Sequence, residues 1–385
     1  MRPGLGDDAA ELVSLVRGFA DAEVAPRAAA DEAAATFPRD VFDALAAIDL
    51  AGLPFKPADG GSGQPLAAYL PVVEELARGS LAVGMGLSVH TLATWAVAEH
   101  GHEPMRSELM PRLTGGDLLG AYALSEPGSG SDAAGLATRM ERDGDGLVLH
   151  GTKAWVTHAG VADVYVVFCR SADAPAEGAG RTRGISAVLV PADTAGLDVA
   201  APERKMGLAA SPTAQLAFDG ARVPAGNLLG AEGQGFEIAM RALDGGRLGI
   251  AACAVGLAQA ALDDAVSYAA LREQFGRRIG DFQGVAFMLA DMATAVASAR
   301  ALTADAAARR DAGAPFSAQA SMAKLAATDA AMRVTADAVQ VHGGYGYTRE
   351  YRVERLMREA KVLQILEGTN QIQRVVIARH LLGAG

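Results

Sequence analysis

The sequence predicts an α+β fold in which a β region is flanked by two helical regions. In the first 120 residues, and again after about residue 230, apolar residues recur at the spacing of a helix. Between these regions, short β-branched runs bounded by turn residues have the pattern of strands. The order helix, sheet, helix is typical of α+β proteins. We therefore predict an N-terminal helical domain (1–120), a middle β domain (121–229) and a C-terminal helical domain (230–385).

Within the N-terminal domain, three segments are predicted to be helical. Apolar residues recur at helical spacing in residues 12–20, 41–50 and 69–77. The intervening segment 57–63 contains a proline, an aspartate and several glycines, which are turn-forming residues. We expect a loop there.

The middle domain is predicted to contain strands over residues 147–149, 164–168 and 185–190. The segment 171–183, rich in Ala, Gly and charged residues, is predicted to be a hairpin loop. In the C-terminal domain, residues 243–272 are apolar around much of the helix circumference. This pattern predicts a long helix that is buried on several sides.

The composition argues against several classes of protein. The net charge is −11 and no cluster of Lys and Arg offsets it, so no nucleic acid is expected as a partner, because phosphate binding needs a basic surface. Cys169 and Cys253 have neither metal-ligand nor disulfide spacing, and no motif predicts a metal site. The first ten residues lack the apolar core of a signal peptide, and no uninterrupted apolar stretch is long enough to span a membrane. We expect a soluble, cytoplasmic protein.

A segment rich in glycine and serine, SEPGSGSD, opens the middle domain at residues 125–132. Its small residues would let the backbone approach a ligand, and its N–H and hydroxyl groups could donate hydrogen bonds. In a following strand, Trp155 and Thr157 alternate onto one face. An indole beside a hydroxyl suits a flat, polar heteroaromatic ring. Taken singly, an ordinary turn and a core tryptophan are the simpler interpretations.

Two further segments could contact a cofactor from the C-terminal domain. Arg272 has a planar set of donors that matches a pyrophosphate, although a lone arginine near a helix end is usually only solvated. The segment QVHGGYG (340–346) ends a helix with a glycine C-cap and a sharp turn. Its His342 is interpreted as a packed histidine rather than a ligand.

A candidate catalytic base lies in the segment LEGTNQ (366–371), between two helical stretches. Thr369 or Asn370 can cap the N-terminus of the final helix. Glu367 lies just before a glycine bend and follows the apolar Leu366, so its carboxylate could lie in a dry pocket. Desolvation there would raise its pKa towards that of a useful base. By position alone, a surface glutamate beside a helix cap is an equally good interpretation.

Together, in their order and spacing, these five motifs resemble the acyl-CoA dehydrogenase family over residues 11–382. The resemblance implies FAD-dependent α,β-dehydrogenation of an acyl-CoA or acyl-carrier-protein thioester to the trans-2-enoyl thioester, a step of the kind found in fatty acid metabolism. It implies that the middle domain is a β-barrel or sandwich and that the C-terminal domain is a four-helix bundle. It further implies a homotetramer that passes electrons to an electron-transferring flavoprotein.

The resemblance also implies which residues contact FAD. Those that would border the flavin ring are Tyr122, Leu124, Ser125, Ser131, Trp155 and Thr157. The adenosine diphosphate part of a FAD held mainly by a neighbouring subunit would be contacted by Arg272, Gln274 and Phe275. The same FAD would be reached across the subunit interface by Gln283, Gln340, Gly343 and Gly344. Thr369 and Gln371 would close the site near the final helix.

By the same resemblance, Glu367 removes the α proton and flavin N5 accepts the β hydride. Some members of the family carry the base immediately before the residue that matches Arg247, but here that position is Gly246. The substrate-binding residues that the resemblance implies are Ser131, Leu243, Asp244, Arg247, Leu366 and Gly368.

Two alternatives stay open: a flavin oxidase or monooxygenase of the nitroalkane oxidase type, and a non-catalytic assembly factor. The first usually alters the base position, and the second would be expected to lose the FAD contacts. The acyl chain is not determined by the sequence, which does not show the facing of Val89, His90, Leu92, Leu243 and Leu366. Many relatives have asparagine where this chain has His158, and the sequence gives no physical account of that change.

Overall fold

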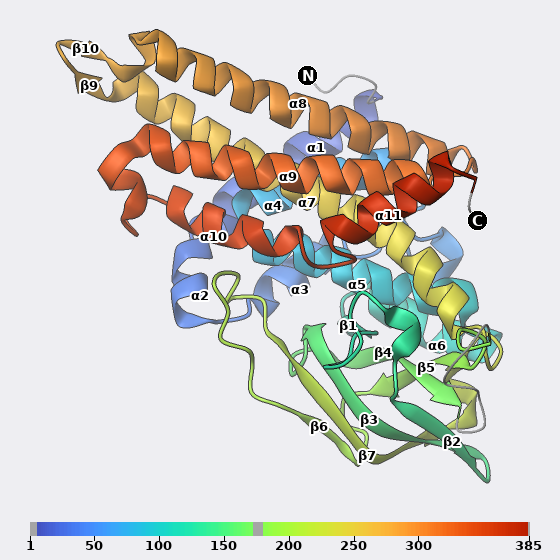
Figure 1. Ribbon diagram of the computed structural model, residues 1–385. Coiled ribbons are helices and arrows are strands. Elements are labelled where there is room, and N and C mark those ends of the chain that lie inside the picture. The colour runs from blue at the N-terminus through green and yellow to red at the C-terminus, as the bar shows by residue number, and fades with distance from the viewer. Residues whose placement is uncertain (1–5, 172–179, 384–385) are drawn as a thin grey trace.

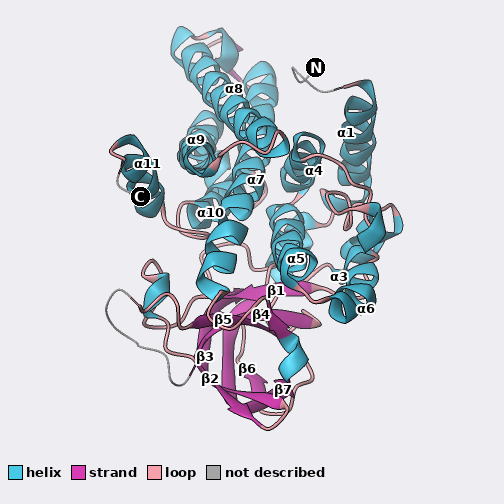
Figure 2. Cartoon of the chain, turned by 90° about the vertical axis from the view of Figure 1, so that its right-hand side faces the viewer, coloured by secondary structure: helices cyan, strands magenta, loops and turns pink. Residues whose placement is uncertain are grey.

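The computed structural model describes residues 6–171 and 180–383, and it has a layer of helices stacked on a β domain (Figures 1 and 2). The helices before the β domain are α1 (Asp7–Phe19), α2 (Ala28–Ala34), α3 (Arg39–Ala47), α4 (Leu66–Gly79), α5 (Leu81–His100) and α6 (Glu103–Thr114). Those after it are α7 (Gly235–Leu271), α8 (Gln283–Asp311), α9 (Ser317–His342), α10 (Val353–Leu363) and α11 (Asn370–Leu381). The predicted α+β fold is therefore confirmed.

The β domain is one mixed sheet that folds around its own core. Its strands are β1 (Gly120–Ala123), β2 (Arg139–Asp143), β3 (Gly146–Thr157), β4 (Val164–Ser171), β5 (Ile185–Pro191), β6 (Leu197–Val199), β7 (Thr213–Pro224) and β8 (Leu228–Leu229). They pair in the order β6-β7-β3-β2-β4-β5-β8, and β1 also pairs with β4. Side chains from β3, β4 and β7, among them Leu149, Tyr165 and Leu216, are enclosed together. The other face of β4 and β5 packs on α5, α6 and the start of α7.

Most predicted segments fall inside observed elements of the same kind. The helical segments lie in α1, α3, α4 and α7, and the three predicted strands lie in β3, β4 and β5. The predicted loop at residues 57–63 begins with one turn of 3₁₀ helix, Pro57–Asp59. Most of the predicted hairpin loop 171–183 lies outside the described residues.

The C-terminal bundle is built around α7 and α9, which pack against each other, with α8 and α10 completing it and α11 lying on α9. Alanine and glycine line much of α7, so neighbouring backbones approach closely. A Cβ atom added at Gly256 would lie only 2.1 Å from the carbonyl oxygen of Glu74 on α4. The low aromatic content therefore serves close helix packing.

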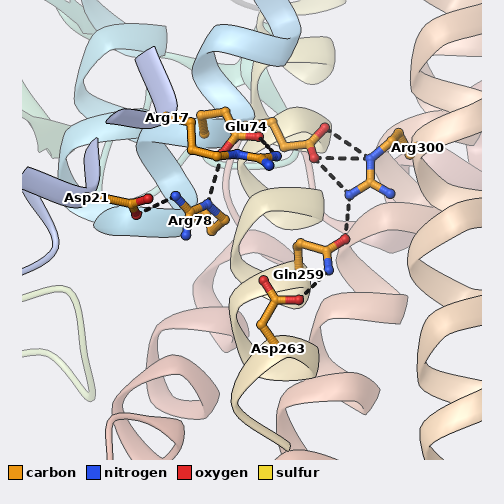
Figure 3. A network of polar contacts seen from close by, with 8 residues as sticks. Arg17, Asp21, Glu74, Arg78, Gln259, Asp263 and Arg300 are labelled. Atoms are coloured by element: carbon orange, nitrogen blue, oxygen red, sulfur yellow. Dashed lines mark hydrogen bonds and ion pairs between the residues drawn. The ribbon is translucent and has the colours of Figure 1, made fainter. Parts of the chain in front are cut away.

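A polar network joins the N-terminal helices to the bundle (Figure 3). Arg300 on α8 donates to the Glu74 carboxylate on α4 at 2.8 Å and to the amide oxygen of Gln259 on α7 at 2.8 Å. On α1, Arg17 donates to Glu75 of α4 at 2.7 Å. Helices far apart in the sequence are thus linked by charge-assisted hydrogen bonds.

By length and mean hydropathy, three helices could cross a membrane: Leu81–His100, Gly235–Leu271 and Gln283–Asp311. The sequence prediction missed them because it counted only uninterrupted apolar residues, and a few polar residues interrupt each helix. The apolar windows of the first two are 83% and 72% buried inside the fold, whereas that of the third is 17% buried. Burial against other helices accounts for the composition of the first two.

A short hairpin, β9 (Glu273–Gln274) and β10 (Arg277–Arg278), projects from the end of α7 and α8 that lies far from the β domain (Figure 1). Its tip carries Phe275, which is 94% exposed, and it follows Leu271, which is 81% exposed.

Candidate active site

A cavity of about 440 Å³ lies between the β domain, α5, α7 and the segment that precedes α11. It brings together residues that are far apart in the sequence. The predicted cofactor and substrate residues that line it are Tyr122, Leu124, Ser125, Ser131, Trp155, Thr157, Leu243, Arg247, Leu366, Glu367 and Gly368. We call it the main cavity.

On the β side of the main cavity, a bulge in β3 presents Trp155. The register between β3 and β7 shifts between Lys153 and Val156, and Trp155 has a φ of +60°. The predicted simple alternation is therefore interrupted, although both Trp155 and Thr157 still line the cavity. The indole is 62% exposed, and bulges of this kind often redirect a side chain at a functional site.

The loop that follows β1 is held by a buried ion pair. Lys153 donates to the carbonyl oxygen of Leu124 at 3.0 Å and to the Glu126 carboxylate at 2.7 Å. That carboxylate also accepts hydrogen bonds from the backbone of Ala137 and Thr138. The strand end that carries Tyr122 and Leu124 is thereby fixed beside the cavity. No sequence motif had indicated this pair.

On the opposite side, Glu367 occupies a tight bend. Glu367 and Gly368 both have left-handed backbones, with φ of +49° and +89°. The Gln373 side chain donates to the carbonyl oxygens of both residues, at 3.3 and 2.8 Å. Thr369 caps α11 as predicted, accepting a hydrogen bond from the N–H of Ile372.

The carboxylate of Glu367 is buried, and within the described part of the chain neither of its oxygens has a hydrogen-bond partner. Burial raises its pKa to about 7, although the positive charges of Lys324 and Arg247 act in the opposite direction. The direction of this shift is the one expected from the sequence. A Cβ atom added at Gly246 would lie 2.2 Å from one carboxylate oxygen, so a larger residue at that position would require the carboxylate to move.

Arg247 is the cation that lines the main cavity from α7. It is ion-paired with Asp244, which also accepts a hydrogen bond from Ser317 at 2.9 Å. Asp244 itself does not line the cavity. Burial raises the pKa of Asp244, and its contact with Arg247 fixes the guanidinium at the cavity wall.

A second cavity, of about 450 Å³, lies beside the β9–β10 hairpin. Four predicted cofactor residues line it: Arg272, Gln274, Gly343 and Gly344. His342 is packed beside it as predicted, stacked on Tyr268 with its Nδ1 donating to the carbonyl oxygen of Ala338. Five other predicted cofactor residues line neither cavity, namely Phe275, Gln283, Gln340, Thr369 and Gln371.

The structure gives a physical account of His158. It follows Thr157 with a left-handed φ of +67°, a conformation that asparagine also tolerates well. Its ring lies against Phe37 and Phe42 and contacts the Gly120 carbonyl oxygen through Nδ1 at 3.2 Å. Burial lowers its pKa to about 4, so the ring is neutral at pH 7.

Of the residues considered for the acyl pocket, four line the main cavity and one does not. Val89, Leu92, Leu243 and Leu366 line the main cavity, as do Met85 and Ile250, which sequence reasoning missed. His90 does not line it, because its ring accepts a hydrogen bond from the N–H of Gly120 and contacts the Leu113 carbonyl oxygen. Helical periodicity marks these residues as buried but does not show which cavity they face.

The residues of the main cavity fit a flavin. An exposed indole and the Thr157 hydroxyl share one wall, and the buried Glu367 carboxylate lies on the other. The described ranges 6–171 and 180–383 contain no group of His, Cys, Asp and Glu that could hold a metal ion.

Family models match nearly the whole chain. They are the N-terminal, middle and C-terminal domains of acyl-CoA dehydrogenases, over residues 6–117, 121–221 and 233–382. An acyl-CoA dehydrogenase of Bacillus subtilis is 46% identical over 370 residues, covering 96% of each chain.

Solved structures agree with this similarity. Butyryl-CoA dehydrogenase from Megasphaera elsdenii is 38% identical, with a TM-score of 0.95, over 99% of this chain and 100% of that one. A chain from a structure described as an electron transferring flavoprotein of Acidaminococcus fermentans is 40% identical, with a TM-score of 0.96, over 99% and 100%. This chain therefore belongs to the acyl-CoA dehydrogenase family, flavoenzymes that remove two hydrogens from adjacent carbons of acyl thioesters.

Proposed function

We propose that this chain binds FAD in the main cavity and uses Glu367 to remove the α proton of an acyl-CoA thioester. One observation carries the proposal. The buried Glu367 carboxylate has no hydrogen-bond partner in the described residues and lines the same cavity as Trp155 and Thr157. A carboxylate held in this way is available to a ligand between the two walls.

The proposed chemistry follows from the state of that carboxylate. A base works best when its pKa lies near the working pH, and burial brings the pKa of Glu367 to about 7. Bound FAD supplies the acceptor for the β hydride. By family resemblance, the backbone N–H of Glu367 donates to the thioester oxygen, where negative charge develops as the α proton leaves. Arg247 is positioned to bind an anionic part of the substrate.

The two separate cavities support an assembly of at least two chains, and we propose the homotetramer that the family resemblance implies. Arg272, Gln274, Gly343 and Gly344 line the second cavity, whereas the proposed flavin contacts line the main cavity. We propose that each FAD contacts both kinds of residue by lying between two chains. The similarity to the Acidaminococcus fermentans chain supports an electron-transferring flavoprotein as the electron acceptor.

The test is an E367Q variant. We expect it to bind FAD but to lose the bleaching of the flavin by acyl-CoA under anaerobic conditions, with the rate falling by about 100-fold or more. E359Q is the matched control, because Glu359 is another buried glutamate whose pKa burial raises to about 7, and it does not line the cavity. We expect E359Q to bleach normally.

Other outcomes would support the alternatives. Normal bleaching in E367Q would overturn the assignment of the base. Purified wild-type protein without FAD would favour the assembly factor, and rapid reoxidation of the reduced protein by air would favour the oxidase.

A further inference from the structure

Lys324 is a fully buried lysine on α9, directly behind the bend that carries Glu367. Its Nζ donates to the carbonyl oxygen of Gly368 and to the side-chain oxygen of Asn370, both at 3.0 Å. A lysine is almost never fully buried without a specific partner. Here both partners belong to the segment that carries the proposed base.

The rest of α9 strengthens this attachment. Asn370 also donates to the Thr328 hydroxyl at 3.0 Å and to the Asp329 carboxylate at 2.7 Å. Because Glu367 is a non-glycine residue in the left-handed region, its backbone conformation persists only where the surroundings fix it. Contacts from α9 on one side and from Gln373 on the other provide that constraint.

The charge of Lys324 has a second effect. Its hydrogen-bond acceptors, Gly368 and Asn370, are both neutral, whereas Arg247, the other cation that acts on Glu367, is already ion-paired with Asp244. Lys324 therefore lies near the carboxylate with no carboxylate of its own in direct contact among the described side chains. Burial lowers the pKa of Lys324 to about 8, so it remains largely protonated at pH 7.

Four other ionisable groups around Glu367 are either uncharged or already paired. Tyr69 on α4, Tyr122 on β1 and Cys253 on α7 have pKa values that burial raises, so each is uncharged at neutral pH. Asp329 on α9 is bonded to Asn370 and ion-paired with Arg374. Of the two cations that lower the pKa of Glu367, Lys324 has the larger effect, and Arg247 is paired with Asp244.

We propose that Lys324 is a positioning residue for the reaction: it holds the bend through the Gly368 carbonyl group and keeps the Glu367 carboxylate ionised at neutral pH. The inference rests on the proposed role of Glu367 as the base. It assigns a function to a residue that does not line the main cavity.

The experiment compares pH profiles of flavin bleaching by acyl-CoA in FAD-loaded variants. The wild-type rate is expected to rise with pH through about 7, because only the carboxylate accepts the proton. In K324M the charge is lost, so we expect the midpoint of the profile to move up by about one pH unit or more. K324R retains the charge and should return the midpoint towards the wild-type value.

N370A separates the two effects of Lys324. It removes a contact between α9 and the bend without removing a charge, so we expect a slower rate with an unchanged midpoint. K324Q repeats the test with a polar, uncharged side chain if K324M binds FAD poorly.

The outcomes distinguish this inference from the proposed function. A wild-type midpoint in both K324M and K324Q, together with inactive E367Q, would overturn the role of Lys324 and leave the base assignment intact. Equal shifts in K324M and N370A would show that disruption of the bend, rather than charge, moves the profile, and would also overturn it. Active E367Q would instead overturn the proposed function.

Discussion

At the scale of single residues, Glu367 should reduce the stability of the protein above neutral pH. Because its pKa is raised from 4.5 to about 7, the native state binds this proton more tightly than the unfolded state does. The contribution of Glu367 to stability is therefore lost as pH rises from about 4.5 to 7. We expect E367Q to be more stable than the wild type at pH 8, by at most about 3 kcal/mol.

Thermal melting of both proteins at pH 5 and pH 8 checks this prediction. The melting temperature of E367Q should exceed that of the wild type by more at pH 8 than at pH 5, because at pH 5 most of the effect has disappeared. An equal difference at both values would contradict a raised pKa at this position.

The neighbours of Glu367, a glycine and an apolar leucine, allowed a buried carboxylate but left a surface glutamate equally open, and the family resemblance made the assignment. In the structure the carboxylate is buried. The sequence could not identify Lys324. A buried lysine has no local signature, because only the tertiary contacts with Gly368 and Asn370 distinguish it from a solvated one. At position 158, the left-handed backbone rather than the imidazole accounts for the exchange of asparagine for histidine.

At the scale of elements, α7 forms a close-fitting wall behind Glu367. G246A would place a methyl group 2.2 Å from the present position of a carboxylate oxygen. We expect the displaced carboxylate to slow flavin bleaching by about 100-fold, which is the order of loss that an error of about 1 Å can cause.

The adjacent glycine supplies the control. A Cβ atom added at Gly245 meets nothing within 4 Å, so G245A should bleach like the wild type. Both substitutions put alanine for glycine inside a helix, which by itself stabilises by about 0.5–1 kcal/mol. Equal rates in G245A and G246A would contradict the proposed contact.

The sequence predicted the regular helices and strands better than the irregularities within them, such as the bulge in β3. Hydrophobic periodicity located α1, α3, α4 and α7 and the strands β3, β4 and β5, because each repeats a simple pattern of burial. The bulge at Trp155 breaks that pattern in a single residue, and only the pairing of β3 with β7 reveals it.

At the scale of the whole molecule, the Arg300 network joins the N-terminal helices to the bundle (Figure 3). R300M would remove one charged partner of the nearly buried Glu74 carboxylate, whose side chain is 7% exposed. We expect a loss of stability of about 2–3 kcal/mol, less than for a fully buried pair. Urea unfolding followed by circular dichroism would measure it.

R309M is the control on the same helix. Arg309 pairs with Asp305 four residues away, and both side chains are about half exposed. Such pairs contribute little, so R309M should change stability by at most about 0.5 kcal/mol. A similar loss in both variants would contradict a specific role for the Arg300 network.

The sequence also did not predict that the cofactor residues would be divided between two cavities. The resemblance assigned Arg272 and Gly343 to the cofactor, and the structure groups them around a cavity of their own. The exposed Phe275 at the hairpin tip has no periodic pattern of burial, so only the resemblance marked it as a cofactor contact.

In the proposed assembly, the separation of the cavities should make retention of the flavin depend on protein concentration. In the proposed assembly, each FAD is a ligand shared by two chains, so it stabilises their association by mass action, and their association in turn slows its loss. Dilution would then release FAD and separate the chains in one linked equilibrium, and added FAD would reverse both changes. A purified sample could lose activity at nanomolar concentration without any chain unfolding.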